Sequence, residues 1–318
     1  MAHDGSVIIA LDGSAHSAQT LEWGMAEAAR RGAEAVLVRA CPGTREINVI
    51  GWYPLLEDEM FEAESRSYLE HTLPRVRERW PGVTVSTRLL HGSEVPVLRD
   101  VSRGAGLLVV GARGHSGRRR LGSTGSHVTA HALCPVAVVR DAQAGAEDGA
   151  PVVVGVDGSV PSVAAARVAA HEASLRGTPL VVVHARPTRL GRHGDGETAA
   201  GSDTSSDADG SSDTAGADDK VGQLARELTE AHPGLEVSVD VRFDDPPRAL
   251  LEAGKGAGLI VVGSRGLGAF RGLLMGSVSS EVVRKADQTV LVVRAGVDDE
   301  AGSGHVEGTD SASPGAAS

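Results

Sequence analysis

The feature that most constrains this 318-residue chain is an internal repeat. Three short segments recur in the same order: VIIALDGS at 7–14 and VVVGVDGS at 152–159, LLVVGARG at 107–114 and LIVVGSRG at 259–266, and VAVVR at 136–140 and VLVVR at 290–294. Self-similarity of this kind indicates a duplicated structural unit. We therefore predict a first domain over 1–141, a linker over 142–150, a second domain over 151–295 with an insertion at 187–219, and a tail over 296–318.

Each copy alternates short apolar runs with segments of helical periodicity. The expected strands are 6–11, 35–40, 83–90, 107–110 and 136–140 in the first copy, and 152–156, 180–184, 235–242, 259–262 and 290–294 in the second. The expected helices are 14–31, 57–80, 94–103 and 122–132, then 161–176, 220–232, 246–254 and 277–286. Strands that alternate with helices predict an α/β fold with a parallel, doubly wound, five-stranded sheet in each copy. Ligands of such sheets bind beyond the carboxyl ends of the strands.

Composition separates the folded parts from polar segments. The insertion, the linker and the tail are rich in Gly, Ser, Ala and Asp, and such sequences bury too little apolar surface to offset the entropy of ordering, so we predict disorder there. These segments together carry more negative charge than the net −11 of the whole chain, and the rest of the chain is slightly positive, so the acidity does not indicate an acidic binding face. Two cysteines, no leader-like segment and no long apolar run predict a cytoplasmic protein that binds neither membrane nor nucleic acid.

A glycine-rich stretch follows the fourth strand of the second copy. The apolar run 259–262 leads directly into Gly263, Arg265 and Gly266, and Gly276-Ser277 begins the next helix. Backbone N–H groups at glycines and at a helix N-terminus favour an anion such as phosphate. The stretch is neither a Walker loop nor a dinucleotide fingerprint, because it lacks Gly-Lys-Ser/Thr and the G-x-G-x-x-G spacing. An ordinary tight turn is the alternative interpretation.

With both copies assembled, the chain resembles a tandem universal stress protein. The resemblance rests on V-x-V-D-G-S, L-x-V-V-G-x-R-G, the glycine loop with Gly-Ser and a closing short strand, and it spans about 280 of the 318 residues. It implies two tandem Rossmann-like domains, related to the adenine nucleotide alpha-hydrolases, and a stress-response sensor or regulator. Some members of that family bind ATP, with Mg²⁺ as a further cofactor, through the spacing G-x2-G-x9-G-[S/T], which the second copy matches.

The resemblance also implies particular contacts in each copy. In the second copy the phosphates would meet Gly263, Arg265, Gly266, Gly276 and Ser277, with Ser279 as a further hydroxyl, while Asp157 would face ribose or adenine and Ala185 the base. The matching residues of the first copy are Asp12, Ala40, Gly111, Arg113, Gly114, Gly122 and Ser123. The expected partners are an adenine nucleotide and the other copy of the domain, and the resemblance also allows a homodimer.

The loop of the first copy departs from the spacing. Pairing Gly122-Ser123 with Gly276-Ser277 leaves seven residues after Gly114 instead of nine, whereas Gly125-Ser126 leaves ten. The centre of the loop is Arg118-Arg119-Arg120, which could hold phosphate or form a solvated basic tip. We predict nucleotide binding more strongly for the second copy than for the first.

Three histidines and a cysteine are further candidates for functional residues. His127 and His131, four apart on a predicted helix, are interpreted as surface or interface residues and not as a metal site. Cys134 is expected to be a buried small side chain, and His184 a strand-end residue bonded to backbone. No nucleophile–base pair is identifiable, so no catalytic residue is predicted and a slow ATPase is the upper limit. The competing hypothesis is a nucleotide-independent interaction scaffold whose copies dock through the strands 136–140 and 290–294.

Overall fold

A computed structural model describes residues 5–41, 54–113, 122–140, 149–186, 212–267 and 275–294. The elements of the first half are β1 (Val7–Ala10), α1 (Ser17–Arg31), β2 (Ala35–Cys41), α2 (Pro54–Arg79), β3 (Val85–His91), α3 (Glu94–Val101), β4 (Leu107–Gly111), α4 (Ser123–His131) and β5 (Val136–Val139). Those of the second half are β6 (Val152–Gly155), α5 (Val160–Arg176), β7 (Leu180–Ala185), α6 (Ser212–Ala231), β8 (Val237–Arg242), α7 (Pro246–Ala253), β9 (Leu259–Gly263), α8 (Ser277–Lys285) and β10 (Val290–Val293).

The predicted order of strands and helices is confirmed, and most bounds differ by a few residues; the largest difference is the start of α6, predicted at residue 220. Helix α6 begins at Ser212, inside the insertion that we predicted to be disordered over 187–219. The helix is anchored by Val221, Leu224 and Leu228, which are buried against the sheet, and adding turns to an existing helix is far easier than nucleating one. Residues 141–148, 187–211 and 295–318 lie outside the described residues, and they include most of the predicted linker (142–150), most of the predicted insertion (187–219) and all of the predicted tail (296–318).

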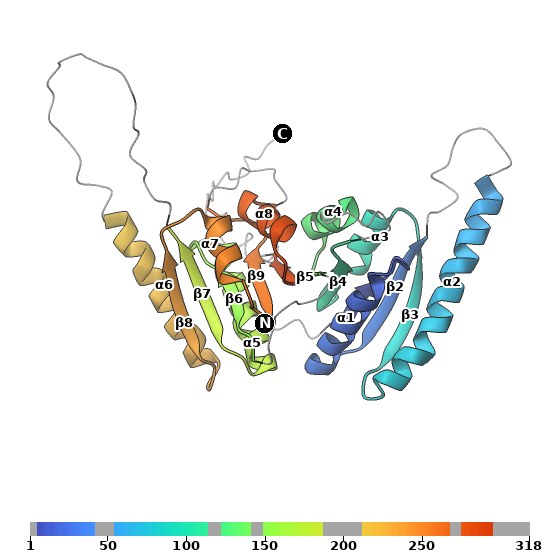
Figure 1. Cartoon of the computed structure of the whole chain (residues 1–318), viewed down its shortest axis with the longest axis horizontal. Coiled ribbons are helices and arrows are strands. Elements are labelled where there is room, and N and C mark those ends of the chain that lie inside the picture. The colour runs from blue at the N-terminus through green and yellow to red at the C-terminus, as the bar shows by residue number, and fades with distance from the viewer. Residues whose placement is uncertain are drawn as a thin grey trace, which may run out of the picture.

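All ten strands join one sheet, in the order β3-β2-β1-β4-β5-β10-β9-β6-β7-β8. Within each half every neighbouring pair is parallel, as predicted. The two halves meet at β5 and β10, which pair antiparallel with Ala137 opposite Leu291. The halves therefore lie side by side about the junction, with α2 and α6 at the two outer ends (Figure 1).

Two layers of helices cover the sheet. Helices α1, α2, α5 and α6 pack on one face, and α3, α4, α7 and α8 pack on the other. Because both faces are covered, the central strands are buried apolar runs such as Leu107–Gly111 and Leu259–Gly263. The core is almost wholly aliphatic, in agreement with an aromatic content of 3%.

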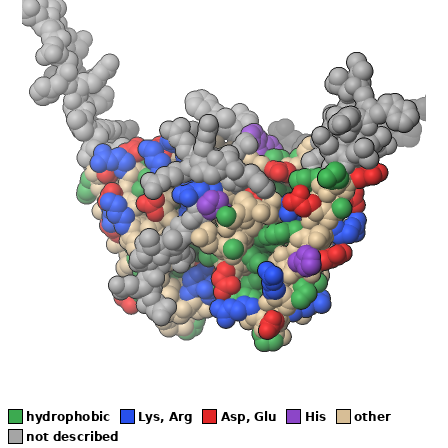
Figure 2. Space-filling view, turned by 45° about the vertical axis from the view of Figure 1, so that its right-hand side comes forward, with side chains coloured by type: hydrophobic (Ala, Val, Ile, Leu, Met, Phe, Trp, Pro, Cys, Tyr) green, Lys and Arg blue, Asp and Glu red, His purple; other side chains and the backbone are tan. Residues whose placement is uncertain are grey.

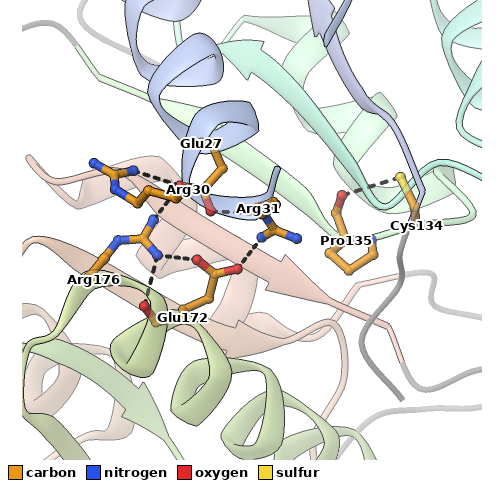
Figure 3. Close-up of polar contacts among 7 residues, drawn as sticks. All are labelled: Glu27, Arg30, Arg31, Cys134, Pro135, Glu172 and Arg176. Atoms are coloured by element: carbon orange, nitrogen blue, oxygen red, sulfur yellow. Dashed lines mark hydrogen bonds and ion pairs between the residues drawn. The ribbon is translucent and has the colours of Figure 1, made fainter. Parts of the chain in front are cut away.

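A cluster of buried charged residues lies where α1 of the first half meets α5 of the second (Figure 3). Glu27 accepts hydrogen bonds from Arg31 (3.0 Å) and Arg176 (2.7 Å), and Glu172 contacts the same two arginines. Burial works against ionisation of Glu27, but Arg176 and Arg31 outweigh it and lower the pKa of this carboxyl. Burial, reinforced by the negative charge of Glu27, raises the pKa of Glu172 to about 7. The pKa values of the two equivalent carboxyls are therefore shifted in opposite directions.

Two equivalent arginines connect the halves on the opposite side of the sheet. Arg140, directly after β5, donates to the carbonyl of Val283 in α8. Arg294, directly after β10, donates to the carbonyls of Ala130 (2.8 Å) and Ala132 (3.1 Å) at the end of α4. Burial and the nearby Arg265 and Arg99 lower the pKa of Arg294. Each last strand thus holds the C-terminal end of the last helix of the other half.

The described surface mixes charges of both signs. Lys and Arg side chains alternate with Asp and Glu side chains over the face in Figure 2 and form no continuous stripe of one sign there. Of the helices in the described ranges, none combines enough length and apolar character to cross a lipid bilayer.

Candidate functional site

A cavity of about 490 Å³ opens at the carboxyl ends of β1, β2 and β4 in the first half. Five residues that the sequence analysis selected line it: Asp12, Ala40, Gly111, Arg113 and Gly122. They come from four separate stretches of the first copy, and the parallel sheet brings them together at one edge. This volume is in the range of pockets that enclose small-molecule ligands.

The turn after β1 forms the floor of the cavity. Asp12 accepts a hydrogen bond from the backbone N–H of Ser14 (2.9 Å) and another from the hydroxyl of Ser17 (2.7 Å). Gly13 has a φ of 82°, which favours glycine, and a Cβ there would lie 2.4 Å from Nη1 of Arg39. The carboxylate is therefore held by the start of α1, and the guanidinium of Arg39 lies beside the next residue, Gly13.

The N-terminus of α4 closes the opposite wall. Gly122 is the N-cap of α4 with extended backbone, as Gly276 is of α8, and both helices have nine residues. The structure thus pairs Gly122-Ser123 with Gly276-Ser277, which resolves the two alignments that the sequence allowed. The first-turn N–H groups of α4, at Ser123, Thr124 and Gly125, have no intrahelical acceptor and favour an anion. Gly114 and the three arginines of the loop lie outside the described residues.

In the second half, Asp157 contacts the glycine loop directly. Its Oδ1 accepts from the N–H and the hydroxyl of Ser159 (3.0 and 2.6 Å), and its Oδ2 accepts from the N–H of Leu267 (2.9 Å). Burial alone would raise the pKa of Asp157, but these hydrogen bonds, with a further one from Ser162, lower it. The carboxylate thus uses the backbone N–H of Leu267, the residue that follows Gly266 in the predicted phosphate loop.

The predicted residues of the second glycine loop divide into packing and exposed positions. A Cβ on Gly263 would lie 2.8 Å from the carbonyl oxygen of Pro161, so this glycine permits close packing of β9 against α5. Ser279 is buried, and its hydroxyl contacts the carbonyls of Ser264 and Gly276 (both 3.1 Å), which fixes the loop internally. Arg265 and Gly266 are half-buried. The side chain of Arg265 adds positive charge beside Arg294.

The second strands of the two halves differ at one position. Arg39 in β2 and His184 in β7 occupy the same register, each one residue before the alanine predicted to lie near the base, Ala40 and Ala185. Both side chains are buried. Nδ1 of His184 donates to the carbonyl of Val156 (2.8 Å), as predicted for a strand-end histidine bonded to backbone, whereas Arg39 lines the cavity.

Comparison with known proteins identifies the family. A family model described as the universal stress protein family matches residues 5–140 and 150–294. The chain belongs to this family. A universal stress protein of Mycobacterium tuberculosis is 32% identical over 303 residues, which cover 91% of this chain and 96% of the relative. A second from that organism is 36% identical over 225 residues, covering 66% of this chain and 69% of the relative.

A solved structure supports the same fold. The crystal structure of a universal stress protein from Archaeoglobus fulgidus matches with a TM-score of 0.64 and 21% identity, over 93% of this chain and 98% of that one. At this identity the likeness shows the shared fold of universal stress proteins. The resemblance stated from the sequence motifs, a tandem universal stress protein with two Rossmann-like units, is confirmed.

Several cavity residues of this universal stress protein were missed by the sequence analysis. Polar or aromatic side chains that line the cavity without having been predicted are Ser17, Thr20, Arg39, Phe61, Glu94 and Thr124. Arg39 could have been predicted from the sequence, because it is the single charged residue in the otherwise apolar strand AVLVRAC. Phe61 and Glu94 come from helices far along the chain, and no local pattern links them to the site.

The other candidates have structural explanations. The rings of His127 and His131 stack with centroids 6.4 Å apart, and Nδ1 of His131 donates to the carbonyl of His127 (2.7 Å). No group of three metal-ligating side chains occurs within the residues that the structure describes. Cys134 is buried as predicted, and its thiol contacts the carbonyl of Pro135 (Figure 3). Burial raises the pKa of this thiol to about 12, so it is an unreactive core residue.

Proposed function

We propose that this universal stress protein binds ATP at the carboxyl ends of its strands and acts as a stress-response sensor or regulator without robust catalysis. The observation that carries the proposal is the cavity of about 490 Å³ lined by Asp12, Ala40, Gly111, Arg113 and Gly122. Residues that the family resemblance implied as nucleotide contacts line one concave site, and a site of this size suits a nucleotide.

The chemistry of the walls supports a triphosphate at one end. The first turn of α4 supplies N–H donors, and Arg113 supplies a cation that can bind phosphate oxygens in a fork. Asp12 is held away from this end by Ser14 and Ser17, so its negative charge suits a ribose hydroxyl better than a phosphate. Mg²⁺ would enter with the triphosphate, because it keeps waters and phosphate oxygens as ligands.

The second half carries the matching glycine loop, and we propose a second nucleotide site there. Binding in that half requires Asp157 to release the N–H of Leu267, which a ribose hydroxyl or a phosphate oxygen could then use. This exchange makes the second site the weaker one, the reverse of the order that the sequence analysis favoured.

Calorimetric titration of the full chain with ATP and Mg²⁺, with nucleotide content measured after denaturation, tests the proposal. We expect binding in the micromolar to millimolar range at one strong and one weaker site. Absence of heat and of bound nucleotide at millimolar ATP would remove the proposed function.

One observation favours a second candidate, the nucleotide-independent scaffold. Strands β5 and β10 pair within the chain, which is the docking that this hypothesis expected of the two copies. We propose that the pairing persists in solution, whereas assembly into a homodimer stays a prediction from the resemblance. Equal thermal stability with and without saturating ATP would favour the scaffold over the sensor.

A further inference from the structure

Arg39 is a buried guanidinium whose hydrogen-bonding capacity the described residues do not use. Its side chain is 4% exposed and lines the cavity from β2. Its Cζ lies 4.9 Å from the ring centroid of Tyr68 and 5.5 Å from that of Phe61, both on α2. Its nearest carboxylate oxygen belongs to Glu64, 3.8 Å away on a side chain that is 73% exposed. Across the described ranges, Arg39 donates no hydrogen bond.

This arrangement is unusual for a buried arginine. The guanidinium carries five N–H donors, and buried charged donors are normally satisfied by acceptors. Aromatic rings hold a guanidinium in place without accepting from its N–H edge. An exposed carboxylate at 3.8 Å contributes little. Within the ranges that the structure describes, the N–H groups of Arg39 therefore have no hydrogen-bond acceptor, and a ligand bound in the cavity could supply one.

The equivalent position of the second half shows the contrast. Nδ1 of His184 donates to the carbonyl of Val156 at 2.8 Å, whereas the guanidinium of Arg39 lies against the rings of Phe61 and Tyr68. A polar side chain at the end of the second strand can thus form its hydrogen bond with the backbone of the protein itself, as His184 does. Arg39 differs, because Phe61 and Tyr68 of α2 contact its guanidinium while the residue lines the cavity.

The sheet determines which part of a nucleotide reaches Arg39. The proposed phosphate end lies at α4, which follows β4, and β1 separates β4 from β2. Neighbouring strands are about 4.8 Å apart, so β2 is roughly 10 Å from β4. A nucleotide with its phosphates at α4 and its ribose at Asp12 therefore presents its base to Arg39.

We propose that the first-half cavity selects a guanine over an adenine nucleotide, with Arg39 as the specificity-determining residue. This rests on the proposed function, since it takes the phosphates to lie at α4. Guanine offers two neighbouring acceptors, O6 and N7, that match the fork of an arginine. Adenine offers N7 beside an amino group, which is itself a donor and opposes the guanidinium N–H groups.

Titrations of the full chain with GTP and with ATP, both with Mg²⁺, test the inference. For the stronger site we expect GTP to bind roughly tenfold more tightly than ATP, the lower part of the range for an arginine–guanine pair. Inosine triphosphate keeps O6 and N7 but lacks the amino group at position 2, so it should bind within about threefold of GTP. This comparison uses the wild-type protein and does not depend on any variant folding.

Variants then distinguish base reading from simple charge attraction. Arg39→Lys keeps the positive charge but loses the fork, so the GTP preference should fall to about twofold or less while ATP affinity changes little. The matched control is His184→Gln at the same register of the second half, which should leave the preference unchanged.

Two outcomes overturn the inference. Equal binding of GTP and ATP, or inosine triphosphate that binds like ATP, would show that Arg39 does not read the base, while the proposed function stands. An undiminished GTP preference in Arg39→Lys would place the discrimination elsewhere. Absence of binding by any of the three nucleotides would instead remove the proposed function, and the inference with it.

Discussion

The two halves share one frame and differ at the edge where a ligand would bind. Their strands have the same order and register, and their last helices have the same length and the same N-cap glycine. At the carboxyl ends of the strands, however, the first half has Arg39 beside an open cavity, whereas the second has His184 bonded to backbone and Asp157 bonded to the glycine loop. The shared fold depends on the apolar runs that form the strands, whereas the chemistry at the carboxyl ends of the strands depends on single polar residues. Duplicated domains can thus keep one fold and diverge in binding.

The largest effect is expected where the halves meet. Glu27→Ala would leave Arg31 and Arg176 without their shared buried carboxylate, and breaking a buried ion pair costs about 3–5 kcal/mol of unfolding free energy. Chemical denaturation measures the change. Glu22→Ala, on the exposed side of the same helix, is the control and should cost less than about 1 kcal/mol. A loss for Glu27→Ala as small as that of the control would show that the cluster does not hold the halves together.

The same cluster predicts a difference in pH dependence between the equivalent carboxyls. Glu172 has a pKa raised to about 7 in the folded state, so the folded protein binds its proton more tightly than the unfolded chain does. Its contribution to stability is full below about pH 4.5 and declines as the pH rises through 7. Denaturation of wild type and Glu172→Gln from pH 5 to 8 should show the variant gaining relative stability with pH. If the stabilities of wild type and variant changed in parallel with pH, the raised pKa of Glu172 would be contradicted.

A substitution in the glycine loop should separate the two binding sites. A Cβ on Gly266 would lie 2.4 Å from Oδ2 of Asp157, so Gly266→Asp forces two carboxylates together and breaks the contact with Leu267. Nucleotide binding in the second half should weaken at least a hundredfold, about 2.7 kcal/mol, while binding in the first half persists. Titration calorimetry would report one site instead of two. Gly82→Asp, in an exposed turn with open space around its Cα, controls for added charge. Two unchanged sites would place the phosphates elsewhere.

The arginines that cross between the halves should have comparable, intermediate effects. Arg140→Ala and Arg294→Ala each remove charge-assisted hydrogen bonds to helix carbonyls, and we expect each to lower the unfolding free energy by about 1.5–3 kcal/mol. Arg140 is the more buried of the two, so its loss should be the larger. Thermal unfolding measures both. A negligible effect of both variants would mean that the β5–β10 pairing alone joins the halves.

The smallest expected effect concerns Ser279. Its hydroxyl contacts two loop carbonyls, and Ser279→Ala should cost about 0.5–1.5 kcal/mol of unfolding free energy with little change in first-half binding. Denaturation and titration of the same sample measure both quantities. A large loss of second-half affinity without a loss of stability would show instead that the hydroxyl contacts the nucleotide, as the sequence analysis proposed.

The fold was largely predictable because its signals are local. Runs such as VVVGVDGS and LIVVGSRG fix strands buried on both faces, and the repeat fixes the order of the elements. The start of α6 was missed because residues 212–219 are polar and helical only as an extension of a packed segment.

The site was predictable only in part. The family resemblance implied Asp12, Gly111 and Gly122, which line the cavity, because the motifs D-G-S and G-x-R-G and the Gly-Ser at the helix start can be recognised in the sequence. It missed Phe61 on α2, since nothing local shows that this helix approaches β2. Gly263 was predicted to contact phosphate, and in the structure it permits β9 to pack closely against α5. The position of a glycine in the sequence does not distinguish a packing role from a binding role.

The central claim is that nucleotide phosphates bind between the end of β4 and the start of α4. Hydrogen–deuterium exchange with and without saturating ATP or GTP measures this at peptide resolution. We expect bound nucleotide to slow exchange at residues 111–113 and 123–125 and to leave the outer strand β3 unchanged. Unaltered exchange at both segments under conditions where calorimetry detects binding would contradict the account.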